Sequence, residues 1–473
     1  MAATMKLTFR FNVFTFSIYF VNLIFCCTCA TPYKYFSTKT PYEWVHSSHI
    51  KDTNTDALFY MNELKGMSCS ALHTSAVIRH GARFPGLEDV HEISNIHAKL
   101  ISAIEPDVHP DLYNWVNKFP SNNNKALSQL GEEEQENLGK RIAQKLSTLF
   151  SDEDFNNFRF IVSSQERTKQ SASAFYEGFT SVLQREDDIE DEFDTEVNDE
   201  LMRFFNLCAK YVYTVERNKT AHNEYYAFMG SEVVNKINNK IHEKLGLKEN
   251  ILTTANVRLI YLVCGYETAV YKHSPWCSLL DEKDMEVLEY LGDLKHYYKN
   301  SYGYNITCDQ SCPLIAEIFL TMDEVITEIE NGDSEDETNG YIVGQFAFGH
   351  AETLGPLYCG LDLFKDPTPL TAENHNTQKD YKFRTSEILP FSANLMFILY
   401  ECVPEELGED EEIEEADYYL KLFVNEKPLQ IPGCEALHCP YKVVRERFHQ
   451  QIDHCDFKHI CQKPALKLAK EEL

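Results

Sequence analysis

The sequence predicts an α/β fold, in which a sheet flanked by helices carries a smaller, mostly helical inserted domain. Short apolar runs alternate with amphipathic helical patterns near both ends of the 473-residue chain. Three of these runs lead directly into polar loops that contain arginine or histidine. The middle of the chain shows long helical patterns instead. We therefore expect one discontinuous α/β domain, residues 31–185 and 310–473, and a helical insert domain at 186–309.

The first 30 residues have the pattern of a secretory signal peptide. They contain Lys6 and Arg10, no acidic residue, an apolar run at 11–25, and small residues that end at Ala30. An uncleaved membrane anchor is the alternative, but the run includes polar residues and is shorter than the roughly 20 residues that a span needs. We expect residues 1–30 to be removed and no stable membrane span to remain.

Cysteine usage fits an oxidising compartment. Three of the fifteen cysteines lie in the leader, and the twelve that remain are an even number, which favours disulfides in a secretory chain. A zinc cluster is the alternative for the cysteines and histidines at 434–461. Their spacing matches no tight ligand template, so we expect disulfides and no metal.

Two further signals concern the secretory pathway. Asn218 and Asn305 each begin an Asn-X-Thr sequon and are candidate glycosylation sites. The last four residues, Lys-Glu-Glu-Leu at 470–473, resemble the K-D-E-L signal that a retrieval receptor recognises. We expect residence in the lumen of the endoplasmic reticulum, with secretion as the alternative.

The net charge of −30 excludes one class of ligand. Much of it lies in two acidic blocks, 184–200 and 404–417. Such a balance argues against nucleic-acid binding. Exposed charges are screened over about 8 Å at physiological salt. The blocks therefore do not preclude a basic pocket elsewhere.

The first predicted strand, 75–78, ends at Arg79 and leads into His80, Gly81, Ala82 and Arg83. Ligands bind beyond the carboxyl ends of strands in open α/β sheets. The small residues after His80 allow backbone N–H groups to approach an anion closely. Arginines that capture a phosphate, with a histidine as nucleophile, are the chemistry that this loop suggests.

Two more predicted strands end in the same way. The strand at 158–162 leads into a polar loop with Arg167, and the strand at 341–348 leads into His350 and Glu352. Further strands are expected at 395–400 and 418–424. Helices are expected at 127–150, 171–182, 233–245, 255–269, 285–299 and 312–330.

Each of these polar residues alone has an ordinary explanation. An arginine is usually a surface charge, a histidine near a strand is often a hydrogen-bonded core residue, and a glutamate can favour a helix N-terminus. The sequence-based case for a site rests on the convergence of three strand ends.

The loop after the first strand, Arg-His-Gly-Ala-Arg-Phe-Pro at 79–85, resembles the R-H-G-x-R-x-P motif of the histidine acid phosphatases. The Gly-His-Ala-Glu sequence at 349–352 is similar to the multiple inositol polyphosphate phosphatase branch, in which His-Ala-Glu replaces the His-Asp of ordinary acid phosphatases. Residues 274–277, 288–304 and 395–400 resemble the same branch. The resemblance implies a histidine phosphatase fold, also described as phosphoglycerate mutase-like, with the α/β domain as the catalytic one.

The resemblance also implies roles for residues. His80 would attack phosphorus to form a phosphohistidine, and Glu352 would protonate the leaving alkoxide. No cofactor and no metal are implied. The residues expected to bind the reacting phosphate are Arg79, Arg83, Arg167 and His350.

For the disulfides, the family pattern suggests that Cys69 pairs with Cys402. Spacing alone cannot establish connectivity. Further candidate pairs are Cys264 with Cys277 and Cys434 with Cys439.

Three functions are weighed. The leading one is hydrolysis of inositol polyphosphates, with inositol hexakisphosphate as the expected substrate. A broad-specificity histidine acid phosphatase acting on small esters such as 2,3-bisphosphoglycerate is the alternative, and a catalytically silent lumenal binding module is the third. The outer basic residues of the pocket cannot be picked out; His97, Lys99 and Lys125 are candidates only by proximity in sequence.

Overall fold

The computed structural model describes residues 35–50, 58–62, 64–122, 124–150, 157–183, 193–248, 251–331, 341–405 and 417–464. All of them belong to one compact unit, residues 33–473. The expected signal peptide, the retrieval-like tail and parts of both acidic blocks lie outside the described residues.

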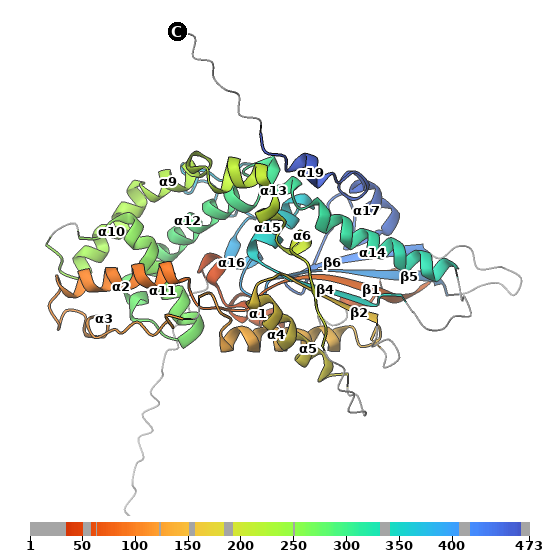
Figure 1. Cartoon of the computed structure of the whole chain (residues 1–473), viewed down its shortest axis with the longest axis horizontal. Helices are drawn as coiled ribbons and strands as arrows, with labels where there is room; N and C mark the ends of the chain where they lie inside the picture. The colour runs from red at the N-terminus through yellow and green to blue at the C-terminus, as the bar shows by residue number, and fades with distance from the viewer. Residues whose placement is uncertain are drawn as a thin grey trace, which may run out of the picture. The chain divides into compact units, whose positions relative to one another are not determined.

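A mixed sheet runs through the protein (Figure 1) in the strand order β3-β2-β4-β1-β5-β6-β7, with β8 paired to β6. The first four strands in this order are parallel, and β5 is antiparallel to β1. The strands are β1 Met67–Arg79, β2 Phe158–Val162, β3 Glu196–Val197, β4 Gly344–Gly349, β5 Asn394–Pro404, β6 Asp417–Val424, β7 Lys427–Leu429 and β8 His438–Pro440.

The longer helices are α1 Tyr42–Ile50, α2 Leu87–Ile101, α4 Gln129–Lys145, α5 Glu166–Thr180, α9 Asn223–Met229, α10 Glu232–Lys244, α11 Thr254–Tyr271, α12 Glu282–Asn300, α14 Cys312–Asn331, α15 Ala351–Gly360 and α17 Tyr441–Arg447. The short helical segments are η1 Ser37–Lys39, α3 Pro110–Tyr113, α6 Asp199–Met202, α7 Phe204–Leu207, α8 Ala209–Tyr211, η4 Val212–Glu216, η5 Lys219–His222, η6 Pro275–Leu279, α13 Asn305–Asp309, α16 Thr385–Ile388, α18 His449–Asp453 and α19 Phe457–Ile460.

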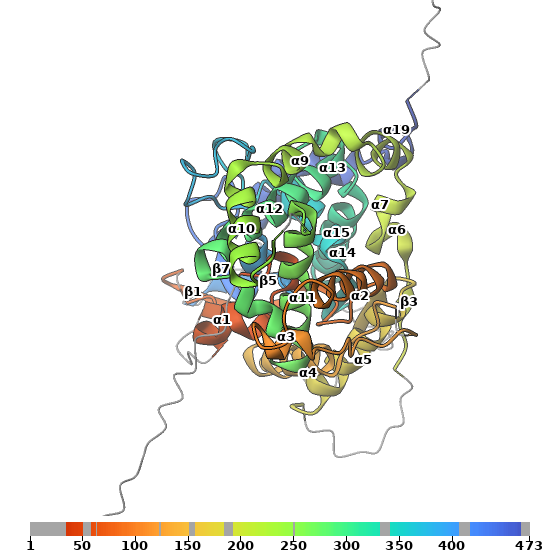
Figure 2. The same ribbon diagram turned by 90° about the vertical axis from the view of Figure 1, so that its left-hand side faces the viewer.

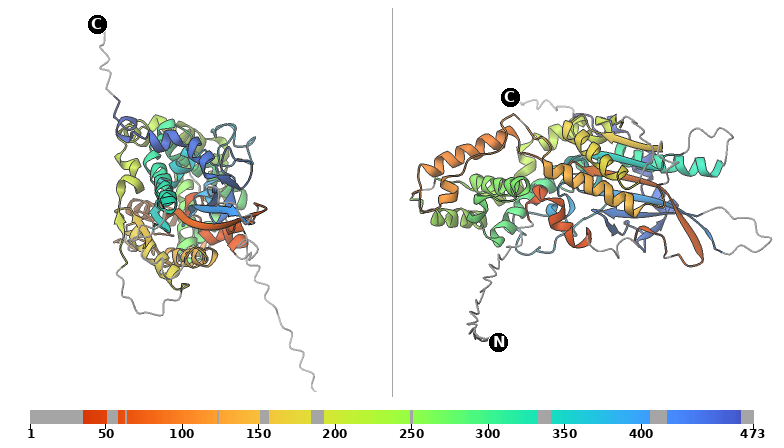
Figure 3. Two further views of the ribbon diagram at one scale, coloured as in Figure 1. Left: turned by 90° about the vertical axis from the view of Figure 1, so that its right-hand side faces the viewer. Right: turned by 90° about the horizontal axis from the view of Figure 1, so that it is seen from below.

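Helices cover both faces of the sheet, as the buried strands require. The helices α4 and α5 lie on one face, which the right-hand view of Figure 3 shows from below, and α14, α15 and α17 lie on the other. Side chains of β1 alternate between the two cores: Val77 packs with the α14 side, and its neighbours Ala76 and Ile78 pack with the α4 side. This period of two is that of a strand buried on both faces.

A second group of helices packs beside the sheet. Helices α2, α9, α10, α11 and α12 contact one another (Figure 2), and α11 and α12 also contact η1. The helical patterns at 233–245, 255–269 and 285–299 are found as α10, α11 and α12, and 312–330 as α14. The division into an α/β domain and a helical insert at 186–309 stays a prediction.

The predicted strands are present, but their bounds differ. β1 begins at Met67, eight residues before the predicted start at position 75, because its first half pairs only with β5 and is partly exposed. The short strands β3, β7 and β8 were not predicted, since two or three residues show no periodicity.

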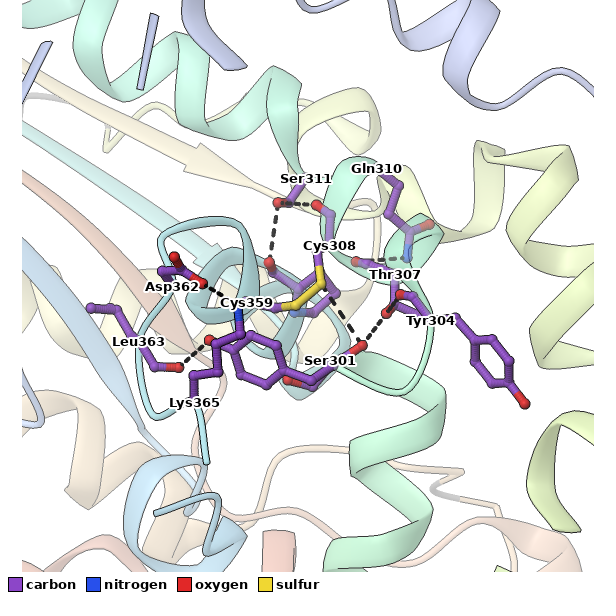
Figure 4. Close-up of a disulfide and its surroundings, with 12 residues drawn as sticks. Ser301, Tyr304, Thr307, Cys308, Gln310, Ser311, Cys359, Asp362, Leu363 and Lys365 are labelled. Carbon is purple, nitrogen blue, oxygen red and sulfur yellow. Dashed lines mark hydrogen bonds and ion pairs between the residues drawn. A yellow bond between two sulfur atoms is a disulfide. The ribbon is translucent and has the colours of Figure 1, made fainter. Parts of the chain in front are cut away.

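The described residues contain six disulfides, four of which join cysteines at least 51 positions apart in the sequence. Three connect the cysteines named above: Cys69–Cys402, Cys264–Cys277 and Cys434–Cys439. The others are Cys208–Cys461, Cys308–Cys359 and Cys312–Cys455. The Cys308–Cys359 bridge ties α13 to the last turn of α15 (Figure 4). All four cysteines of the zinc alternative at 434–461 are therefore in disulfides.

Within the described residues, no helix is both long and apolar enough to cross a membrane.

Candidate active site

The polar residues predicted from the sequence lie where three parallel strands end. They come from the loop after β1, from the first turn of α5 after β2, and from the N-cap and first turn of α15 after β4: Arg79, His80, Arg83, Arg167, His350 and Glu352. Because β4 lies between β1 and β2, the three loops leave the same edge of the sheet. The register pairs Arg79 with Gly349 and Val162 with Phe348, so the strands end at one level.

His80 is buried with one ring nitrogen engaged. Its Nδ1 lies 2.8 Å from the carbonyl oxygen of Gly81. Because a carbonyl oxygen can only accept, Nδ1 carries the proton and Nε2 keeps its lone pair. Burial, and then the charges of Arg167 and Arg79, lower the pKa of His80 well below its ordinary value. The imidazole is therefore neutral, as a nucleophile requires.

The backbone around His80 is fully hydrogen-bonded. The His80 N–H donates to Gly349, and its carbonyl accepts from Ser392. The Gly81 N–H donates to the Ser171 hydroxyl. A Cβ on Gly81 would lie 2.2 Å from the carbonyl oxygen of Gly131, so only glycine permits this approach of the loop to α4. Hydrogen bonds and close packing within the protein therefore hold the backbone of this loop.

The Arg79 guanidinium is held by two backbone carbonyl groups and by an aromatic ring. Its Nη1 donates to the carbonyl oxygens of Thr38 at 2.8 Å and Leu389 at 2.7 Å. The guanidinium lies 4.7 Å above the Phe391 ring. Two segments distant in the sequence thus fix its position.

The three arginines share an unusual feature. Each of Arg79, Arg83 and Arg167 has a buried Nε with no hydrogen-bond partner among the described residues. An unpaired buried donor costs about 1 to 3 kcal/mol, more when it is charged. The charges of all three arginines act on His80, so the three side chains lie near it and form a site that suits a tetrahedral oxyanion.

Both ring nitrogens of His350 are engaged by the protein. Arg167 Nη2 donates to Nδ1 at 3.1 Å, so Nε2 carries the proton and donates to Ser163 Oγ at 3.0 Å. Burial and Arg167 lower the pKa of His350 to about 3, so the ring is neutral. His350 orients Arg167 here, and its direct contact with phosphate stays a prediction.

Glu352 faces the cations of the site. Burial opposes ionisation of its carboxyl, but the neighbouring groups, and Lys299 first among them, outweigh this effect and lower the pKa of Glu352 well below its ordinary range. It is a carboxylate in this structure. To donate a proton, it needs a bound polyanion whose phosphates offset these cations.

A cavity of about 210 Å³ adjoins these residues through Arg83 and Glu352. Its wall is formed by η1, the loop with Lys125, and helices α11 and α12. Six basic side chains line it, against the two carboxylates of Asp89 and Glu352: Lys39, Arg83, Lys125, Arg258, Lys295 and Lys299. Burial and neighbouring cations lower the pKa of Lys295 to about 8. A protein of net charge −30 therefore contains a strongly cationic cavity.

A second cavity, of about 380 Å³, shares Tyr225 and Arg258 with the first. Arg258 thus lies at the junction of the two.

Of the three outer basic candidates, the structure places only Lys125 in the cationic cavity. His97 lines neither cavity: its ring packs against Trp115 and Trp276, and its Nε2 bonds to the carbonyl of Leu112. Lys99 lines the second cavity instead.

Sequence reasoning missed Lys39, Arg258, Lys295 and Lys299. The last two are four residues apart and hence on one helix face, which is the one signal that could have paired them. Nothing in the sequence connects that face with η1.

Among the residues that the structure describes, no group of three or more His, Cys, Asp or Glu side chains is arranged to hold a metal ion.

Comparison with known proteins gives a family match. Residues 73–425 match the model of the histidine phosphatase superfamily (branch 2). The chain is 33% identical over 433 residues to multiple inositol polyphosphate phosphatase 1 of Gallus gallus, covering 91% of this chain and 93% of that protein. It is 30% identical over 455 residues to the Homo sapiens protein of the same name, covering 93% and 91%.

Solved structures share the fold. The multiple inositol polyphosphate phosphatase of Bifidobacterium longum, in complex with inositol hexasulfate, matches with a TM-score of 0.67 at 15% identity, over 86% of this chain and 96% of that one. The phytase from D. castellii matches with a TM-score of 0.64 at 17% identity, over 87% and 88%.

Proposed function

We propose a reaction and a substrate from the premise that the chain belongs to branch 2 of the histidine phosphatase superfamily. The reaction is removal of phosphates from inositol polyphosphates, with inositol hexakisphosphate as the main substrate. The observation that carries it is the set of three unpaired buried arginine donors beside the free Nε2 of His80.

The first step transfers the phosphoryl group to the enzyme. His80 Nε2 attacks phosphorus, the bond from phosphorus to the ester oxygen breaks, and the leaving alkoxide takes the proton of Glu352. Arg79, Arg83 and Arg167 stabilise the charge on the equatorial oxygens. The product is a phosphohistidine and a free hydroxyl on the inositol ring.

The second step restores the enzyme. A water molecule attacks phosphorus, the Glu352 carboxylate takes its proton, and the bond from phosphorus to Nε2 breaks. Inorganic phosphate leaves and His80 is neutral again. Glu352 releases this proton once phosphate has left, because the empty site holds it as a carboxylate, and takes up a proton again when the next polyanion binds.

The cationic cavity supports a polyphosphate substrate. An ester with one phosphate would occupy the three arginines and leave Lys39, Arg258 and Lys295 without an anion. These like charges disfavour one another, so a ligand whose further phosphates offset them binds better. The relatives named above as inositol polyphosphate phosphatases point to the same class.

The alternative substrate, 2,3-bisphosphoglycerate, is supported by the small volume of the cationic cavity, about 210 Å³. The test measures phosphate release by the wild-type protein and by His80→Ala. The substrates are inositol hexakisphosphate, 2,3-bisphosphoglycerate and p-nitrophenyl phosphate. We expect kcat/KM to be highest for inositol hexakisphosphate and His80→Ala to be folded and inactive. A higher kcat/KM for 2,3-bisphosphoglycerate or p-nitrophenyl phosphate would refute inositol hexakisphosphate as the main substrate. An active His80→Ala would refute the assignment of His80 as the nucleophile.

For the compartment, the six disulfides and the relatives indicate a secretory-pathway protein. Within that pathway we place it in the lumen of the endoplasmic reticulum, on the strength of its C-terminal Lys-Glu-Glu-Leu. Deletion of residues 470–473 should move the protein into the medium of expressing cells. Equal secretion with and without the tail would contradict retrieval.

A further inference from the structure

We infer that Glu134 is a positioning residue, whose buried carboxylate joins the three chain segments that hold His80 and Arg79 in place. Glu134 lies on α4 and has no role in the proposed reaction. The inference rests on that reaction, because positioning has a measurable effect only in an enzyme that turns over.

The Glu134 carboxylate accepts one hydrogen bond from each of three segments. Its Oε1 accepts from the Tyr42 N–H at 2.9 Å. Its Oε2 accepts from the Ala82 N–H at 2.8 Å and from the Ser392 hydroxyl at 3.1 Å. Glu134 is only 3% exposed, so water does not compete for these donors.

Each of the three segments contains, or contacts directly, at least one of the two residues His80 and Arg79. Ala82 is two residues after the nucleophile, His80. The segment that ends at Tyr42 supplies the Thr38 carbonyl that binds Arg79. The segment that ends at Ser392 supplies the Leu389 carbonyl to Arg79 and the backbone N–H that binds the His80 carbonyl. Movement at Glu134 would therefore reach both catalytic-site residues at once.

The neighbouring Gln135 completes the arrangement. Its Nε2 donates to the Arg79 carbonyl and to Ser392 Oγ, both at 2.9 Å. The Ser392 hydroxyl accepts from Gln135 and so is free to donate to Glu134. Ser392 has a left-handed backbone, with φ of 56°, a conformation that costs roughly 1 to 2 kcal/mol in a residue with a Cβ. These hydrogen bonds hold it there.

The position needs a carboxylate rather than an amide. All three groups that face Glu134 donate. Burial raises the pKa of Glu134 to about 7, and above that pH the side chain is a carboxylate, which only accepts. A glutamine of the same shape would turn its NH₂ group toward at least one of these donors. At least one of the three segments would then lose its attachment.

The test compares Glu134→Gln with wild type on inositol hexakisphosphate. We expect kcat to fall about 10- to 100-fold, because small displacements of catalytic groups have effects of this size. KM should change by less than about threefold, since the cationic cavity is untouched. Ser392→Ala, which removes one of the three donors, should lower kcat in the same direction by a smaller factor.

A matched control separates positioning from general destabilisation. Glu267 is also 3% exposed and accepts hydrogen bonds from Trp115 Nε1 and Ser274 Oγ, in the helical region. Glu267→Gln should lower the thermal unfolding midpoint and leave kcat as in wild type.

The outcomes are distinct. A kcat within twofold of wild type in a folded Glu134→Gln protein would overturn the inference. So would a loss in Glu267→Gln as large as that in Glu134→Gln. If Glu134→Gln does not fold, an unchanged kcat in Ser392→Ala overturns it. Failure of the wild-type protein to release phosphate would instead overturn the proposed function.

Discussion

The guanidinium of Arg167 donates from Nη2 to Nδ1 of His350 at 3.1 Å, across the carboxyl ends of β2 and β4. This bond fixes the tautomer of His350 and the direction of Arg167 together. Neither residue can be moved without releasing the other.

Removal of either partner should therefore have nearly the same effect as removal of both. We expect kcat/KM of Arg167→Ala with His350→Ala to be close to that of the worse single variant, with a coupling energy of about 0.5 to 3 kcal/mol. The measurement is a double-mutant cycle on one substrate. Losses that multiply would show that the two residues act separately.

The lowered pKa of His80 gives a pH prediction. The attacking nitrogen must be unprotonated. Burial and the arginine charges lower the pKa of His80 well below its ordinary value of 6.5, so this nitrogen stays unprotonated at pH values below 6.5. Protonation of His80 should therefore not limit activity between pH 7 and 5. A loss in this range that comes from Glu134, whose pKa burial raises to about 7, should be absent from the pH profile of Glu134→Gln. A pH profile of kcat/KM with inositol hexakisphosphate checks this. An acidic limb centred near 6.5 that follows imidazole protonation would contradict it.

Glu352→Gln should distinguish good leaving groups from poor ones. An inositol alkoxide needs a proton to depart, whereas nitrophenolate does not. We expect a loss of about 10²- to 10⁴-fold in kcat for inositol hexakisphosphate and a much smaller one for p-nitrophenyl phosphate. Equal losses on both substrates would mean that Glu352 is not the acid.

The cationic cavity should affect substrates according to their charge. Lys295→Met should raise KM for inositol hexakisphosphate about tenfold or more, since a hydrogen bond to a charged group is worth about 1.5 to 3 kcal/mol. It should leave p-nitrophenyl phosphate nearly unaffected. Lys283, exposed on the same helix α12, gives the matched control Lys283→Met. Equal effects of the two substitutions would contradict a role for the cavity in substrate choice.

Acid stability should depend on Glu426. This buried carboxylate lies 2.8 Å from Arg141 and 3.0 Å from Lys145. Burial opposes its ionisation, but these cations outweigh burial and lower the pKa of Glu426 from 4.5 to about 2. A lowered folded-state pKa gives stability that is present above pH 4.5 and is lost as pH falls toward 2.

The lost stability should amount to about 3 kcal/mol, measured as the free energy of unfolding in urea at each pH. In Glu426→Gln the difference from wild type should shrink over this range. Glu136→Gln, which removes a surface pair with Lys140, is the control and should leave the acid limb unchanged. A constant difference between wild type and Glu426→Gln would contradict the prediction.

The sequence predicted the strand ends well because their signal is local. The apolar run before Arg79 and the run before His350 are each bounded by polar loops, and a parallel sheet brings such ends together. This is why six residues from three distant loops could be proposed as one site.

The rest of the site depends on tertiary contacts. Lys39 lies in a short helical segment whose place is set by the hydrogen bond from Arg79 to Thr38 and by the contact of η1 with α11 and α12. Glu134 looks like one of three consecutive glutamates at the start of an amphipathic helix. Only the packing of α4 against the loop of Ala82 makes it different from Glu132 and Glu133.

The topology of the sheet also sets an order of events during synthesis. β1 carries the residues of the catalytic loop, yet its antiparallel partner β5 follows far along the chain, and the cysteines that join the two strands are 333 residues apart. At about 5 to 20 residues per second, a ribosome needs roughly 15 to 70 s to add that length. During this time the apolar strand β1 has no β5 to pair with. The nascent chain is therefore expected to depend on lumenal chaperones until its last third has been translated.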